Sequence, residues 1–172
     1  GWGYIAPREI AAIYKELSDG NEPVLDIGAG TGLLAESMPG MTVDAFDISA
    51  EMLAKAEAKG LYRARHVGDL TQPLALDDAS YGGVISCGTF THGHVGPEAL
   101  PELIRVTRPG ALFVCGCIPP VFDGMGFGSA LGLMVARREI TPVDFRDSPI
   151  YEDGATHAHA RDRGLVMAFR RL

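Results

Sequence analysis

One stretch of sequence, Val24-Leu-Asp-Ile-Gly-Ala-Gly-Thr-Gly32, predicts both the class of fold and the kind of ligand. Its first four residues form a short apolar run that reads as a buried strand, and the helical pattern of Leu33–Met38 follows its last glycine. Glycines at a strand-to-helix turn allow positive φ angles and let a ligand approach the backbone without meeting a Cβ atom. A tight turn without a ligand would show the same three glycines, so the pattern by itself is weak.

A carboxylate at the end of the next predicted strand strengthens the ligand interpretation. Asp47 ends the run Val43–Asp47, about 20 residues after Gly28, which is the separation at which an acidic side chain meets a ribose in dinucleotide-binding folds. A carboxylate there accepts hydrogen bonds from both ribose hydroxyls. The alternative is a carboxylate that only marks the start of the helix capped by Ser49.

Two classes of nucleoside ligand fit this arrangement. Dinucleotide sites favour the pattern G-x-G-x-x-G, which needs a glycine where this chain has Leu33. They also place a pyrophosphate against a positive helix end. Asp26, two residues before the first glycine, is better suited to a ligand that carries a cationic amino group.

Strands and helices are predicted to alternate through most of the chain. The early strands are apolar runs, as in strands that helices cover on both faces, so we predict an α/β fold with a mostly parallel sheet. In such sheets ligands bind at the carboxyl ends of the strands. The predicted strands are 24–27, 43–47, 62–67, 83–87, 112–117, 140–145 and 165–170, and the predicted helices are 7–17, 33–38, 50–59, 97–108 and 129–138.

Composition and charge limit the possible partners. The chain has 172 residues, 47% of them hydrophobic and 22% charged, and we expect one domain over residues 1–172. Its formal net charge of −7 argues against a nucleic-acid or anionic-membrane partner, because phosphate binding needs clustered positive charge. The three cysteines cannot build a disulfide framework and the apolar runs are too short to span a bilayer, so we expect a cytoplasmic protein with reduced thiols.

Five segments, taken in order, resemble class I S-adenosylmethionine (SAM)-dependent methyltransferases. Residues 24–32 resemble that family's first motif, and Phe46–Ala56 its second. Gly68–Leu70 is similar to the adenine-binding loop, Tyr81–Gly88 to the fourth strand, and Leu103–Gly110 to the helix and turn before the fifth strand. Such concordance is more specific than any one motif. The resemblance implies a Rossmann-like, doubly wound sheet of seven strands in the order 3-2-1-4-5-7-6, mostly parallel with an antiparallel last strand.

Within that family, three shorter segments resemble the Williams–Beuren syndrome region methyltransferase-like group. They are Lys59–Tyr62, Thr91–His94 and Pro142–Asp144. Members of the family commonly begin with a segment containing tyrosine and tryptophan that covers the cofactor. Here only Gly1-Trp-Gly-Tyr4 is similar to it, so we expect part of this N-terminal lid to be missing.

The resemblance also implies which residues bind the cofactor. Asp26 would orient the methionine end of SAM, Asp47 would hold the ribose hydroxyls, and Ile48 would pack on the adenine. Asp69 would accept a hydrogen bond from the exocyclic amine of adenine, and the Leu70 N–H would face a ring nitrogen. The implied cofactor-binding residues are Asp26, Gly28, Ala29, Gly30, Asp47, Ile48, Asp69, Leu70 and Cys87.

Tyr4, His92 and His94 are predicted to lie on the side of the methyl acceptor. His92 follows the fourth strand, on the loop that faces the methyl group in the family, and histidine side chains can accept a proton from a hydroxyl or an amine near neutral pH. The alternative is a loop histidine without a catalytic role, because methyl transfer from a sulfonium relies mainly on alignment. His157 and His159 form a second pair, but no carboxylate spacing supports a metal site, and none is predicted.

The resemblance therefore implies an enzyme that transfers a methyl group from SAM to an oxygen or nitrogen nucleophile of a small molecule. The transfer would be an in-line displacement that releases S-adenosylhomocysteine (SAH). One alternative is a SAM-binding sensor or partner subunit without catalysis. A third possibility, an NAD-dependent oxidoreductase, is disfavoured by Leu33.

Overall fold

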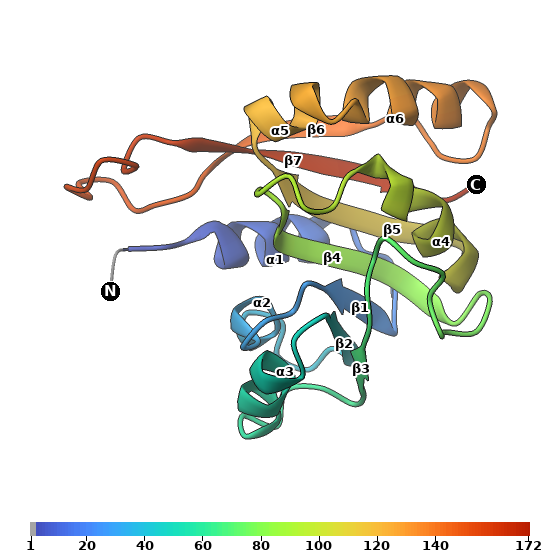
Figure 1. Cartoon of the computed structure of the whole chain (residues 1–172), viewed down its shortest axis with the longest axis horizontal. Coiled ribbons are helices and arrows are strands. Elements are labelled where there is room, and N and C mark those ends of the chain that lie inside the picture. Colours follow the sequence, from blue (N-terminus) through green and yellow to red (C-terminus); the bar gives the residue numbers. More distant parts are fainter. Residues whose placement is uncertain (1–2) are drawn as a thin grey trace.

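The computed structural model describes residues 3–172. Seven strands form one sheet in the order β3-β2-β1-β4-β5-β7-β6, which confirms the predicted fold class and strand order (Figure 1). The pairs among β1 to β5 are parallel, whereas β7 is antiparallel to both of its neighbours. The strands are β1 (Val24–Ile27), β2 (Val43–Asp47), β3 (Arg65–Val67), β4 (Tyr81–Phe90), β5 (Thr107–Cys117), β6 (Asp144–Pro149) and β7 (Arg163–Arg170).

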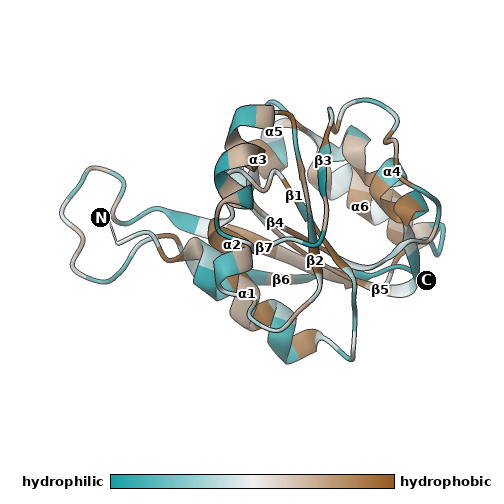
Figure 2. Ribbon diagram, turned by 90° about the horizontal axis from the view of Figure 1, so that it is seen from below, coloured by the Kyte–Doolittle hydropathy of each residue, from teal (hydrophilic) through white to brown (hydrophobic). Residues whose placement is uncertain are grey.

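Helices cover both faces of the sheet (Figure 2). Alternate residues of the central strands serve the two faces: Ile85 packs with α1 and α2, and its neighbour Val84 packs with α4 and α6. Because helices pack on both faces of the sheet, the central strands carry apolar side chains on each face. Among the described residues, no helix has the length and apolar character that a bilayer crossing requires. The helices are α1 (Ala6–Leu17), α2 (Leu33–Glu36), α3 (Ala50–Glu57), η1 (Pro97–Ala99), α4 (Leu100–Val106), α5 (Pro119–Gly124) and α6 (Phe127–Ala136).

The register of the parallel strands brings three chain segments to one edge of the sheet. Asp26 on β1 is level with Ala45 on β2 and with Ile85 on β4. Residues two positions further along these strands, among them Asp47 and Cys87, therefore meet beside the glycine turn that follows β1. This edge is formed by the carboxyl ends of the strands, where ligands of open α/β sheets bind.

The N-terminal residues run beside the loop that joins β6 to β7. Residues 3–6, here called the N-terminal strap, pair with this loop through an antiparallel bridge between Tyr4 and Tyr151, whose ring centroids are 5.9 Å apart. Figures 1 and 2 show the loop, residues 150–162, projecting from the body of the molecule next to the strap. Of the predicted lid segment, Gly1-Trp2 lies outside the described residues.

One predicted strand is misplaced in the sequence. The prediction of a strand at 140–145 is wrong in its bounds, because β6 spans Asp144–Pro149 and Ile140 forms only an isolated bridge with Arg171. β6 is an edge strand with charged side chains along it, as edge strands often are. An edge strand of this kind lacks the apolar run on which the prediction relied.

One helix was not predicted, and several other boundaries differ from the prediction, among them the start of β5 at Thr107 rather than at residue 112. Pro119 and Pro120 interrupt an apolar run, yet they open α5, because proline fits the first turn of a helix. The third strand was predicted to begin at Tyr62, whereas β3 begins at Arg65. Tyr62 instead turns inward and donates a hydrogen bond to Asp26.

Candidate functional site

The turn after β1 uses backbone conformations that favour glycine. Gly28, Gly30 and Gly32 have φ angles of 67°, 54° and 90°, in the left-handed region that side chains disfavour. Asp47 fixes this turn from the neighbouring strand: its Oδ2 accepts from the Gly30 N–H and its Oδ1 from the Ser49 N–H, each at 2.8 Å. The Asp47 carboxylate therefore ties the glycine turn to the start of α3.

The first two glycines lack a side chain for different reasons. A Cβ atom at Gly28 would lie 2.1 Å from Thr89 Oγ1, which donates to the Ile27 carbonyl at 2.7 Å. Gly28 is thus needed for close packing against β4. Among the described residues, a Cβ atom at Gly30 would meet only Met52 Cε within 4 Å, at 3.7 Å. The space above Gly30 is therefore open to a ligand.

A cleft of about 660 Å³ lies between the glycine turn and the ends of β2 and β4. Its volume is within the range of roughly 300–1,000 Å³ found for small-molecule sites. Ile48, whose side chain is 71% exposed, and Met52 form part of its wall. This main cleft is lined by seven of the predicted cofactor residues and one predicted acceptor-side residue: Gly28, Gly30, Asp47, Ile48, Asp69, Leu70, Cys87 and His94.

A smaller cavity of about 180 Å³, the inner cleft, adjoins the main cleft. Asp26 and Ala29, the two remaining predicted cofactor residues, line it, and so does Tyr4. The two cavities share Gly28, Gly30, Met52 and Cys87. The structure thus gathers every residue predicted for the cofactor around two adjoining cavities.

Asp26 is fully buried in the wall of the inner cleft. The Tyr62 hydroxyl donates to its Oδ2 at 2.7 Å, whereas Oδ1 has no hydrogen-bond partner among the described residues. Burial raises the pKa of this carboxyl to about 7, against the opposing effect of the Tyr62 hydrogen bond. An unpartnered buried carboxylate oxygen beside a cavity is suited to a cationic ligand group.

The burial of Asp26 predicts a pH-dependent stability. The carboxyl holds its proton more tightly in the folded protein, with a pKa of about 7, than in the unfolded chain, with a pKa of about 3.9. Stability from this group is therefore present below about pH 4, declines as the pH rises to about 7, and is constant above it. In urea unfolding of the ligand-free protein, we expect this decline to reach roughly 3–4 kcal/mol.

The decline should vanish in Asp26→Asn, which cannot ionise. Asp123→Asn, at an exposed position of α5, should keep the wild-type pH dependence. An Asp26→Asn variant whose unfolding free energy follows the wild-type curve from pH 4 to 7 would contradict the assignment of this titration to Asp26.

Asp69 begins a tight turn at the other end of the main cleft. Its Oδ1 accepts from the N–H of Thr71 at 2.8 Å and from the Thr71 hydroxyl at 2.7 Å, and these bonds hold the pKa of Asp69 below its usual range. The carboxylate is therefore ionised at neutral pH and able to accept further hydrogen bonds. Leu70, next along the chain, is buried, with 8% exposure.

The predicted acceptor-side residues lie in different places. The Tyr4 hydroxyl and Cys87 Sγ are 3.1 Å apart, and burial raises the pKa of the Cys87 thiol to about 11, so it stays protonated near neutrality. His94 lines the main cleft. His92 lines neither cleft, and its Nδ1 is 2.8 Å from Thr91 Oγ1.

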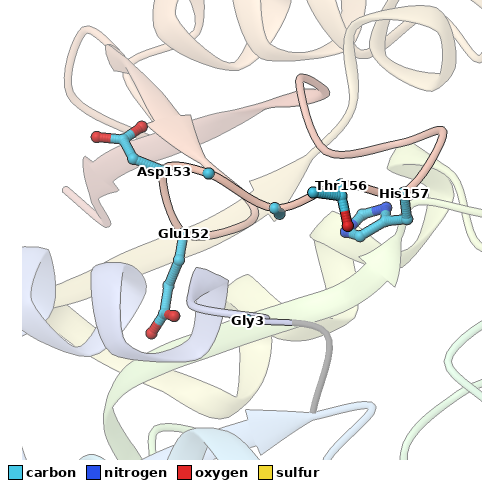
Figure 3. Close-up of a pocket in the computed structure, with 7 residues that line it drawn as sticks. Gly3, Glu152, Asp153, Thr156 and His157 are labelled. Atoms are coloured by element: carbon cyan, nitrogen blue, oxygen red, sulfur yellow. The ribbon is translucent and has the colours of Figure 1, made fainter.

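A separate hollow of about 430 Å³ lies against the projecting loop, with Gly3, Glu152, Asp153, Thr156 and His157 around it (Figure 3). Figure 3 shows Glu152 and Asp153 pointing in different directions. Across residues 3–172, no group of three or more His, Cys, Asp or Glu side chains is arranged to hold a metal ion. The chemistry-bearing residues instead converge on the two clefts at the strand ends.

The fold and the clefts define an α/β protein with a candidate ligand site at the strand ends, and comparison with known families makes the class specific. A family model described as a methyltransferase domain matches residues 25–115, more than half of the 172-residue chain. The chain belongs to this methyltransferase domain family. It is a SAM-dependent methyltransferase, and SAM is its cofactor.

Solved structures share the fold at low sequence identity. A SAM-dependent methyltransferase from Methanosarcina mazei is 16% identical, with 93% of this chain and 97% of that chain covered and a TM-score of 0.69. A chain from the complex of the Haloferax volcanii Trm112 methyltransferase activator is 17% identical, with 99% and 90% covered and a TM-score of 0.72. A TehB-like SAM-dependent methyltransferase from Corynebacterium glutamicum is 21% identical, with 95% and 87% covered and a TM-score of 0.64. The search of curated proteins finds no match.

The residues around the clefts fit SAM. The unpartnered Oδ1 of Asp26 suits the ammonium group of the methionine end, and the open space above Gly30 leaves room for a ligand against the backbone. The apolar surface of Ile48 suits a flat adenine ring. The walls thus offer both a buried carboxylate and apolar groups, as a cofactor with a charged and an aromatic end requires.

Sequence reasoning missed three residues that shape the site. Tyr62 donates a hydrogen bond to Asp26, Thr89 packs closely against Gly28, and Met52 lines both clefts. Met52 carried a usable signal, because it lies in the first turn of the helix that follows Asp47. The other two act through contacts between distant segments, which no local pattern encodes.

Proposed function

We propose that this methyltransferase acts on an oxygen or nitrogen nucleophile of a small molecule. The observation that supports the cofactor site best is the gathering of all nine predicted residues around two adjoining clefts. When bound, SAM supplies an electrophilic methyl group on a sulfonium sulfur. The chain's own contribution is then to bind, to align and to exclude water, and alignment alone supplies a large share of such rate enhancements.

Different residues of the clefts bind different parts of SAM. Asp47 accepts hydrogen bonds from the ribose hydroxyls, and Asp69 accepts one from the exocyclic amine of adenine, with Ile48 packed on the ring. Asp26 pairs with the ammonium group, beside the backbone of Cys87. Support for these roles comes from the presence of these residues in the walls of the two clefts and from the unpartnered Oδ1 of Asp26.

The finer kinship proposed is with the Williams–Beuren syndrome region methyltransferase-like group. It rests on the segments Lys59–Tyr62, Thr91–His94 and Pro142–Asp144. Two of them contribute to the site, because Tyr62 holds Asp26 and His94 lines the main cleft. The main cleft, at about 660 Å³, is of the size found for small-molecule sites, which supports a small acceptor.

His92 is proposed to take up the acceptor's proton at its Nε2. The Thr91 hydroxyl donates to the Gly88 carbonyl, so Thr91 Oγ1 accepts from His92 Nδ1 at 2.8 Å, and this contact orients the ring and leaves Nε2 of the neutral imidazole free to accept a proton. We expect His92→Ala to lower kcat about 100-fold while the Kd for SAH stays within a few fold. The pH profile of kcat should also differ between the two proteins, because the variant lacks the imidazole that accepts the proton.

His159→Ala, on the projecting loop, is the matched control and should leave kcat and its pH profile unchanged. Equal values of kcat for wild type and His92→Ala would remove His92 from the proton path. A lower kcat with an unaltered pH profile would show that His92 shapes the loop and does not accept the proton.

Calorimetry with SAM, SAH and NAD tests the cofactor assignment, and turnover with a panel of small alcohols, phenols and amines tests the acceptor class. We expect SAM and SAH to bind and NAD to give no heat. SAM binding without turnover on any panel member, and with turnover on a protein substrate, would overturn the small-molecule proposal.

A further inference from the structure

A third cavity, here called the apolar slot, opens beside Cys87 and has a volume of about 60 Å³. It shares Cys87 and Gly88 with the main cleft, and Tyr4 and Cys87 with the inner cleft. Cys87 is therefore a wall common to all three cavities. A molecule in the slot would lie next to whatever occupies the two clefts.

The slot is built from apolar side chains of segments that are far apart in the sequence. α1, β4, β5, the start of β7 and the residues around the end of β6 all contribute. None of the described residues that line the slot carries a formal charge. The apolar side chains are Ile10, Val166, Ile118, Ile150, Leu165 and Pro149.

The polar groups of the slot are already bonded to one another or to the backbone. Thr91 Oγ1 lies 2.5 Å from the Gly88 carbonyl, and the Cys117 thiol donates to the Phe90 carbonyl at 3.1 Å. The Tyr4 hydroxyl is held against Cys87. A charged ligand group would therefore find no counter-charge in the slot, and burying it there would carry the full cost of desolvation.

We propose that the slot receives the apolar end of the methyl acceptor, and that the acceptor is a neutral hydroxyl compound with a short hydrocarbon end. Its hydroxyl then lies at the mouth of the slot, beside Cys87 and Thr91 and next to the clefts. This inference rests on the proposed function and narrows it, because acceptors that carry a carboxylate or an ammonium group on that end are excluded.

A glycine controls the size of the slot. A Cβ atom at Gly164 would lie 3.5 Å from Ile150 Cγ1, 3.6 Å from the Ser148 carbonyl and 3.8 Å from the Cys117 carbonyl, all ordinary contact distances. These three neighbours all line the slot. A larger side chain at 164 would therefore fit the strand and occupy part of the slot.

The test is a series of straight-chain alcohols, from ethanol to 1-hexanol, bound to the SAH-saturated protein and followed by ligand-observed NMR. Each added methylene should tighten binding about fourfold until the slot is full, after which the affinity should level off. 4-Hydroxybutanoate and 4-hydroxybutylammonium, which keep the hydroxyl of 1-butanol and carry a charge on the far end, should bind at least tenfold more weakly than the alcohol.

Two variants should shift, in opposite directions, the alcohol length at which the affinity levels off. Gly164→Val should make the affinity level off at a shorter alcohol, and Leu165→Ala at a longer one, with the Kd for SAH unchanged in both. Gly132→Val, on the exposed face of α6 with nothing within 4 Å of its Cβ position, is the control and should follow the wild type.

The proposal is overturned if either ion binds as tightly as 1-butanol, or if neither variant moves the point at which the affinity levels off. SAH that fails to bind the wild type would contradict the proposed function itself. SAH that binds normally, without any dependence of alcohol affinity on chain length, would contradict only the apolar slot.

Discussion

Gly30→Val should abolish the binding of SAM and SAH and leave a folded protein. The Gly30 φ angle of 54° is one that β-branched residues strongly disfavour. The two methyl groups would also fill the open space above the turn, where Met52 Cε is the one atom of residues 3–172 within 4 Å of the Cβ position. We expect no measurable heat on titration with SAH and a circular dichroism spectrum like that of the wild type.

Gly40→Val separates backbone strain from loss of the ligand's space. Gly40 has a φ angle of 80° and nothing within 4 Å of its Cβ position, and it lies between α2 and β2, away from the clefts. The strain should cost about 1–2 kcal/mol of stability in each variant. Gly40→Val should nevertheless bind SAH like the wild type. Normal SAH binding by Gly30→Val would place the cofactor elsewhere.

The sequence-based predictions were most accurate where one local pattern decides the structure. The run Val24–Ile27 is buried at every position, and β1 and β2 begin and end where the apolar runs predict. The glycine turn and Asp47 could likewise be placed, because the register of two parallel strands converts their separation in the sequence into a shared edge. Local periodicity and the pairing of parallel strands are enough for this half of the molecule.

The rest depends on contacts that no local pattern contains. The Tyr62–Asp26 and Tyr4–Cys87 hydrogen bonds join residues 36 and 83 positions apart in the chain. Each contact forms only because the fold brings two distant segments together, so neither could be predicted from the local sequence. The loop from Thr91 to His94 is a similar case, since its position beside β4 was predictable and the direction of each histidine was not. For this reason the cofactor residues gather as predicted, whereas the role of His92 as the proton acceptor stays a proposal.

Asp47→Ala should weaken the binding of both SAM and SAH about 30- to 150-fold, or about 2–3 kcal/mol. The variant loses the hydrogen bonds that the two ribose hydroxyls donate to a charged carboxylate, and such bonds are among the stronger ones in proteins. It also releases the N–H groups of Gly30 and Ser49, each bonded to Asp47 at 2.8 Å. Isothermal titration measures the Kd, and thermal unfolding records the accompanying loss of stability.

Those two backbone bonds create an ambiguity, because Asp47 could act on the ligand only by holding the turn. The 2′-deoxy analogue of SAH resolves it. A ribose contact predicts that removing the hydroxyl weakens binding to the wild type about tenfold and has little effect on binding to Asp47→Ala, since the partner is already gone. A carboxylate that acted only as a brace for Gly30 and Ser49 would give the same penalty in both proteins. Equal penalties would therefore rule out the ribose contact even if Asp47→Ala binds SAH poorly.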